Sequence, residues 1–192
     1  MKTIVLASSS PRRKELLEKT GLKFIVDSAG GGESLDSKLA PRELAKYLSG
    51  EKARAAAIKY PSSLIIAADT FGVLGGKLLG KPADERQAVE MLKMMSGRKH
   101  TVITGFTVLD ASSGRSVTEV VETGVQFHAL SEDEINAYVR SGEPLDKAGA
   151  YAIQGLGALL VDKIDGDYYN VVGLPLAALA KALKKFGVYL LK

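Results

Sequence analysis

The sequence predicts an α/β fold, because short apolar runs alternate along the chain with longer segments that carry helix start and stop signals. The clearest strand is 64–68, which is apolar throughout and is typical of a fully buried strand. The clearest long helix is 41–60, where leucines and alanines form an approximate apolar stripe. The 192 residues contain no internal repeat, low-complexity tract or linker, so we expect a single domain over 1–192.

The N-terminal segment combines a strand, a run of hydroxyl residues and a helix. Residues 3–7 predict the strand and 11–20 the helix, with Ser10 as its N-cap and proline at its first position. Such a connection directs free backbone N–H groups at one point, which favours an anion. Residues 12–14 (Arg-Arg-Lys) are cations where a helix start normally favours acidic side chains. The segment is therefore either an anion site or a solvated basic first turn.

A glycine-rich loop with one carboxylate follows the predicted second strand. Residues 23–27 predict that strand, and 30–33 (Gly-Gly-Gly-Glu) predict the loop. The loop lacks the lysine and the spacing of a Walker phosphate loop, so a surface loop is favoured for the glycines. The role of Glu33 is left open by this pattern.

Polar residues end the buried strand at 64–68. Asp69 and Thr70 follow it directly, and ligands of open α/β sheets collect at the carboxyl ends of strands. Asp69 is therefore either a functional carboxylate or the cap of a turn. Residues 71–79 predict a hairpin around a Gly-Gly turn, and Lys81 leaves it between a glycine and a proline.

The second half of the chain predicts further elements of the same kinds. Helices are expected at 84–95, at 131–140 and from 175 to about 185, and strands at 101–109, 115–129 and 158–164. The segment 146–157 is too rich in glycine for a helix. Its Gly-Leu-Gly lacks the third glycine and the following helix of a dinucleotide-binding site, so we do not expect such a site there.

Composition excludes several classes of function. The chain has no cysteine, which removes disulfides and thiolate nucleophiles, and only two histidines, which argues against a His-rich metal cluster. It shows neither a signal peptide nor an apolar run of membrane-spanning length, so we expect a cytoplasmic protein without a membrane partner. The net charge of +4 is carried by dispersed residues. It fits a small anionic substrate at least as well as nucleic acid, and the lack of a continuous basic stripe or an aromatic platform counts against a nucleic-acid-binding module.

Cations, carboxylates and small hydroxyls recur at the predicted strand and hairpin ends. The cations are Arg12, Arg13, Lys52, Lys81 and Lys147, the carboxylates Glu33 and Asp69, and the hydroxyls Ser8 and Thr70. Neither histidine belongs to a recognisable Ser–His–Asp set. Such a composition suits phosphoryl chemistry, in which cations and a divalent metal hold phosphates while a carboxylate binds the metal or activates water.

Several motifs resemble one known family. They are Leu-Ala-Ser-Ser-Ser-Pro-Arg-Arg at 6–13, Ala-Ala-Asp-Thr at 67–70, Gly-Lys-Pro at 80–82, Asp-Lys-Ala-Gly-Ala-Tyr-Ala-Ile-Gln-Gly at 146–155 and Gly-Leu-Pro-Leu at 173–176. In this order they resemble the Maf family of nucleoside triphosphate pyrophosphatases over nearly the whole chain. The resemblance implies an elongated Maf/ITPase-like fold, with a mixed twisted sheet and two lobes around a central cleft. It also implies a homodimer that hydrolyses a nucleoside triphosphate to the monophosphate and pyrophosphate with Mg²⁺ or Mn²⁺.

The resemblance also implies roles for individual residues. Ser8, Arg12, Lys52 and Lys81 would hold phosphates, Asp69 would be the general base or a metal ligand, and Glu33 would help to hold the metal. Arg13, Thr70 and Gln154 match the positions of the dTTP/UTP-selective branch. One departure is that glycines 30–32 stand where relatives have a more acidic approach to Glu33. Relatives are linked to septum arrest, so the competing hypothesis is a regulator of cell division that senses nucleotides without turnover.

Overall fold

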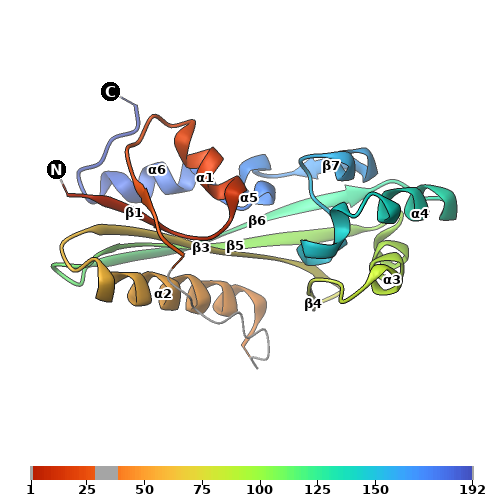
Figure 1. Ribbon diagram of the computed structural model, residues 1–192, viewed down its shortest axis with the longest axis horizontal. Helices are drawn as coiled ribbons and strands as arrows, with labels where there is room; N and C mark the ends of the chain where they lie inside the picture. Colours follow the sequence, from red (N-terminus) through yellow and green to blue (C-terminus); the bar gives the residue numbers. More distant parts are fainter. Residues whose placement is uncertain (1, 29–38, 192) are drawn as a thin grey trace. The chain divides into compact units, whose positions relative to one another are not determined.

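The computed structural model describes residues 2–28 and 39–191 (Figure 1). Within these residues, seven strands form one mixed sheet in the order β2-β1-β3-β5-β6-β7, with β4 paired to β3. The strands are β1 (Ile4–Ala7), β2 (Ile25–Val26), β3 (Leu64–Leu74), β4 (Lys77–Leu79), β5 (Lys99–Asp110), β6 (Ser116–Phe127) and β7 (Val161–Asp165). The mixed α/β class expected from the sequence is confirmed.

The helices of the described residues fall into two kinds. The α-helices are α1 (Pro11–Glu18), α2 (Pro41–Lys59), α3 (Glu85–Met95), α4 (Glu132–Arg140), α5 (Tyr168–Val172) and α6 (Leu176–Lys184). The 3₁₀ helices are η1 (Glu143–Asp146), η2 (Ala148–Ala150) and η3 (Leu156–Leu160). All three 3₁₀ helices fall in or next to the glycine-rich segment that was not expected to form an α-helix.

The chain divides into two compact units. The first contains Met1–Asp69, Thr104–Val121 and Gly173–Lys192, and the second contains Thr70–Ile103 and Glu122–Val172. Both units are assembled from separate stretches of sequence, so neither is a continuous domain. The single-domain expectation stays a prediction.

The first unit is built on parallel strands covered by helices. β1 pairs in parallel with β2 and with β3, and Ala7 lies opposite Ala67 in the register. In Figure 1, α2 lies on one face of these strands, and α1 and α6 lie on the other. The core between these strands and α2 is apolar and made of small and branched residues, with Val5, Ala7, Ile65, Ala67 and Leu109 on the strands and Ala53 and Ala56 on α2.

The position of α2 on the sheet is set by close contacts with β5. A Cβ on Gly105 would collide with the backbone carbonyl of Ala45 in α2, so only glycine permits this approach. One turn further along the helix, the buried hydroxyls of Ser49 and Thr107 are hydrogen-bonded at 3.0 Å. These contacts fix the face that α2 turns toward the sheet.

The second unit packs α3 and α4 together over its own apolar core. Asp84 caps α3 and Ser131 caps α4 through a complete capping box. β3 and β4 form the expected hairpin, with Gly75 and Gly76 at φ of 57° and 80°. Positive φ at both turn residues is what a type I′ turn requires, and glycine supplies it without strain.

The structure corrects two of the expected boundaries. β3 does not end at Asp69 and Thr70 but continues to Leu74, because Phe71 is buried and the end of the strand pairs with β4. The strand expected at 158–164 begins only at Val161, since the residues before it belong to η3.

One helix was missed. The sequence Tyr-Tyr-Asn-Val-Val of α5 has no intrinsic helical signal, but Asp167 accepts hydrogen bonds from the amides of Tyr169 and Asn170 at 2.8 and 3.3 Å. These bonds begin the helix.

Candidate phosphate-handling site

Asp69 and Lys52 form an ion pair in the first unit. Ile65 and Ala67 face α2, and because side chains alternate along a strand, Asp69 faces the same way. Lys52 lies on α2, three residues after Ser49. Its Nζ is 2.5 Å from Oδ1 of Asp69, and the two side chains are only 14% and 10% exposed. The structure therefore brings together two of the predicted catalytic residues.

Both members of the ion pair can make further contacts. A carboxylate this buried needs a partner, and the ammonium group supplies one. A lysine ammonium has three donors, and the contact with Asp69 uses one of them. The carboxylate in turn can accept further hydrogen bonds or a proton. Lys52 can thus contact an anion while it holds Asp69, which suits either a general base or a metal ligand.

Ser8 begins the loop between β1 and α1. Because Ala7 lies opposite Ala67 at the end of the parallel pairing between β1 and β3, Ser8 directly follows the paired residues of β1 and Asp69 follows those of β3 by two residues. Ser8 is buried, and its Oγ accepts the amide of Ser10 at 3.2 Å. This bond turns the chain toward the helix.

Arg13 supports this loop from the first turn of α1. Its Nη1 donates to Oγ of Ser8 at 3.2 Å, and its Nε donates to the backbone carbonyl of Gly173 at 2.8 Å. Ser10 caps the helix as expected, with its Oγ accepting the Arg13 amide. Arg12 is half-buried and, within residues 2–28 and 39–191, has no hydrogen-bond or ion-pair partner. The loop is therefore held in place before any anion binds.

The second unit contains Thr70, Lys81 and Gln154. Thr70 is half-buried on β3 and directly follows Asp69. Lys81 is exposed after β4, and the carbonyl of the preceding Gly80 accepts the amide of Gly149 at 2.9 Å. Gln154 is half-buried in the short segment before η3. These three residues lie on separate segments of the unit.

The described residues offer one carboxylate suited to a divalent metal, and the other candidate, Glu33, is not among them. Among the described residues no three histidine, aspartate or glutamate side chains gather at one point. Mg²⁺ is commonly held by one or two carboxylates together with substrate phosphates and water. The Asp69 carboxylate fits that pattern as a single protein ligand.

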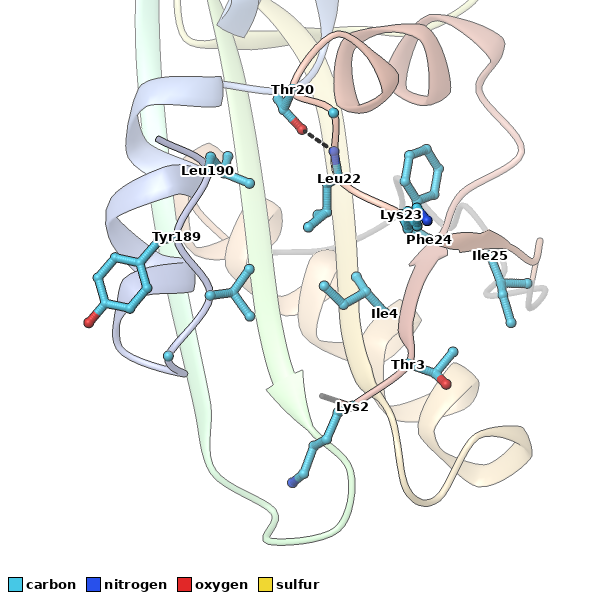
Figure 2. A pocket seen from close by; sticks show the side chains of 13 residues that line it. Lys2, Thr3, Ile4, Thr20, Leu22, Lys23, Phe24, Ile25, Tyr189 and Leu190 are labelled. Carbon is cyan, nitrogen blue, oxygen red and sulfur yellow. Dashed lines mark hydrogen bonds between the residues drawn. The ribbon is translucent and has the colours of Figure 1, made fainter. Parts of the chain in front are cut away.

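A separate groove lies elsewhere in the first unit (Figure 2). It has a volume of about 820 Å³ and is lined by residues 2–4 at the start of β1, by the segment 20–25 and by the C-terminal segment 187–190. None of the predicted site residues lines it. The groove is therefore distinct from the loop and ion pair described above.

Glu143 and Tyr138 were not predicted from the sequence, yet they bind the segment that carries Gln154. The Glu143 carboxylate accepts the amides of Leu156 and Gly157, and Tyr138 donates its hydroxyl to the same carboxylate. The only signal was a glutamate beside Pro144, just before the glycine-rich segment. Such a residue is ordinary in a surface turn.

A preordered loop at a helix start, together with a lysine–aspartate pair between α2 and β3, is an arrangement typical of proteins that handle phosphate groups. The comparison of sequences agrees with this class. Residues 3–186 match the family described as Maf-like protein, and the chain belongs to that family.

Relatives cover nearly the whole chain. A dTTP/UTP pyrophosphatase of Methanosarcina barkeri is 51% identical over 98% of this chain and 96% of its own. Proteins of the same name from Pelotomaculum thermopropionicum and Bacillus pumilus are 50% and 45% identical, over 97% and 98% of this chain and 98% of their own length in both cases. A solved structure of a HAM1 protein from Coxiella burnetii shares the fold, with a TM-score of 0.53 and 13% identity over 96% of this chain and 100% of that one. Among the described residues, no helix has the length and apolar character to cross a membrane.

Proposed function

We propose that this protein is a nucleoside triphosphate pyrophosphatase that hydrolyses dTTP and UTP to the monophosphate and pyrophosphate. The reaction class is carried by the contact of Lys52 with Asp69 next to the loop of Ser8 and Arg12. The substrates are supported by the names of relatives up to 51% identical over nearly the full length.

The chemistry requires a base and a set of cations. A water molecule attacks the α-phosphorus and gives its proton to the Asp69 carboxylate, while the bond to the oxygen bridging the α- and β-phosphates breaks. The electron pair of that bond leaves with pyrophosphate. Arg12, Lys52 and Lys81 would offset the charge on the phosphate oxygens, and Ser8 would donate a hydrogen bond. A bound Mg²⁺ or Mn²⁺ would add Lewis-acid polarisation of the phosphates, with Asp69 as its ligand and Glu33 as a second.

Selectivity for the base is proposed to depend on Gln154, with Arg13 and Thr70. The amide of Gln154 offers one acceptor and donors, so it can pair with N3–H and O4 of uracil or thymine. Turned over, the same amide can pair with cytosine. Arg13 has only donors, which favours a carbonyl at position 4. Its bonds to Ser8 and Gly173 add a second role, because they support the phosphate loop.

A turnover panel tests this function. Purified protein is incubated with dTTP, UTP, CTP, GTP and ATP in Mg²⁺ or Mn²⁺, and pyrophosphate and monophosphate are measured. We expect release from dTTP and UTP, weaker release from CTP, and little from the purines because of their size. Binding of UTP without any pyrophosphate would instead support the nucleotide-sensing regulator of septum formation.

Four further properties are proposed. A homodimer and a dependence on divalent metal rest on the family resemblance, and the absence of cysteine fits a reducing, cytoplasmic environment. The dispersed cations argue against nucleic acid as a partner. Sedimentation tests the homodimer, and metal titration after chelation tests the dependence on metal. DNA binding at physiological salt tests the absence of a nucleic-acid partner.

A further inference from the structure

We infer that Glu143 is a positioning residue that orders the loop 152–157 around Gln154 and thereby sets the selectivity for the pyrimidine base. This inference rests on the proposed function, because it concerns how Gln154 is presented to the substrate. All the residues that carry it lie in the second unit.

The hydrogen bonds of Glu143 and Tyr138 hold the loop on both sides of Gln154. Oε1 of Glu143 accepts the amide of Gly157 at 2.9 Å, and Oε2 accepts the amide of Leu156 at 3.0 Å. The hydroxyl of Tyr138 donates to Oε1 at 2.8 Å and accepts the amide of Ala152 at 3.2 Å. One carboxylate and one phenol thus fix backbone amides two residues before Gln154 and two and three residues after it.

The charges in this network are consistent with strong bonds. Burial acts to raise the pKa of Glu143, but the Gly157 amide, the Tyr138 hydroxyl and the Leu156 amide outweigh it, so the pKa lies below its ordinary value. Burial and the neighbouring carboxylate raise the pKa of Tyr138, so its hydroxyl stays protonated and able to donate. Bonds from neutral donors to a charged carboxylate are stronger than bonds between neutral groups.

The glycines of the loop are explained by the same two side chains. Gly155 has a φ of +105°, which favours glycine, and a Cβ there would collide with the Glu143 carboxylate. A Cβ on Gly157 would collide with the Ala152 carbonyl and would lie 2.7 Å from the Tyr138 hydroxyl. The Gly-Leu-Gly sequence, which resembles half of a dinucleotide fingerprint, is therefore shaped to pack against Glu143 and Tyr138.

Removing the negative charge of Glu143 should loosen the loop 152–157 without changing how phosphates bind. In Glu143→Gln, the new NH₂ group faces donors, so at least one of the three bonds is lost and an amide is left without an acceptor. We expect the ratio of kcat/KM for UTP over CTP to fall about 10- to 100-fold, mostly through a higher KM for UTP. Inhibition by inorganic tripolyphosphate, which has no base, should stay unchanged.

The experiment compares wild type with three variants. Glu132→Gln is the matched control, since it removes an exposed glutamate of the same helix, α4, whose carboxylate is paired with Lys93 at 2.5 Å instead of with the loop. Tyr138→Phe removes the bond to Ala152 and one bond to Glu143, and serves if Glu143→Gln does not fold. For each protein we measure kcat and KM with UTP and CTP, the Ki of tripolyphosphate, and amide hydrogen exchange over 152–157.

The outcomes separate positioning from mere stabilisation. Faster exchange over 152–157 together with a reduced UTP/CTP ratio and an unchanged tripolyphosphate Ki supports the inference. An unchanged UTP/CTP ratio, or a Ki that rises as much as the KM for UTP, overturns it. If wild type releases no pyrophosphate, the proposed turnover fails, and the same ratio is then measured as Kd for UTP and CTP by calorimetry. Absence of UTP binding overturns both proposals.

Discussion

Replacing Asp69 with asparagine separates the chemical role of this residue from its structural role. The substitution keeps the shape of the side chain but removes the charge that accepts a proton from water. Loss of a general base typically lowers the rate by about 10²–10⁴-fold, which corresponds to roughly 3–5 kcal/mol in the activation barrier. We therefore expect kcat of Asp69→Asn with UTP to fall by about that factor.

The cost in stability should be much smaller. Asp69 loses a charge-assisted bond to Lys52, worth about 1.5–3 kcal/mol, and the asparagine carbonyl can still accept from the lysine. For a chain of 192 residues, 1 kcal/mol shifts Tm by roughly 2–4 °C. The expected decrease in Tm is therefore at most about 3–12 °C, and the protein should remain folded at assay temperature.

Pyrophosphate release and thermal unfolding are measured on the same preparations. Asp110→Asn is the matched control, because Asp110 also pairs with a lysine at 2.5 Å, Lys2, but lies at the end of β5 outside the proposed site. The control should lose some stability and keep its turnover. Near-normal turnover by folded Asp69→Asn would show that Asp69 is neither the base nor an essential metal ligand.

Three further predictions concern binding, selectivity and pH. Arg12→Ala and Lys81→Ala should each lower kcat/KM about 10- to 100-fold with little change in Tm, and a loss of stability without a fall in kcat/KM would instead indicate a structural role. Gln154→Glu replaces a donor with an acceptor and should weaken UTP hydrolysis, while equal cleavage of CTP, GTP and UTP by wild type would contradict base reading. Burial lowers the pKa of His100 from 6.5 to about 4. As the pH falls below 6.5, this histidine is therefore protonated in the unfolded state while it stays neutral in the folded state. The free energy of unfolding should fall by up to about 3 kcal/mol between pH 6.5 and pH 4. Urea titrations of wild type and His100→Gln over this pH range should show that the free energy of unfolding declines less steeply in the variant. Parallel declines would show that His100 does not cause the loss of stability.

Local signals in the sequence predicted where several helices begin and where one hairpin turns. Ser10 was expected to cap a helix, and the helices expected from 84 and from 131 begin at the caps Asp84 and Ser131. Each of these three side chains accepts a backbone amide of the first turn. The Gly-Gly turn between β3 and β4 was predicted for the same reason. Helix caps and tight turns both depend on a few neighbouring residues, so a short stretch of sequence contains the interactions that determine them.

The partner of Asp69 could not be predicted in this way. The basic residues of α2 are spread around the helix, so its pattern favours none of them. The choice of Lys52 depends on which face of α2 meets the sheet, and that is decided by the close approach at Gly105 and the bond from Ser49 to Thr107. These contacts join residues far apart in sequence, and a periodic pattern carries no information about them.

The basic first turn of α1 shows how the fold distinguishes residues that look alike in sequence. Three consecutive cations follow Pro11, and the sequence allowed either an anion site or a solvated turn. Arg13 is half-buried and donates to Ser8 and to the Gly173 carbonyl. Lys14 is about half exposed and lies 3.7 Å from Glu18, a surface pair that contributes little. Arg12 alone of the three has no partner within the described part of the chain, so the repulsion at the helix start is left uncompensated at the position proposed to bind phosphate.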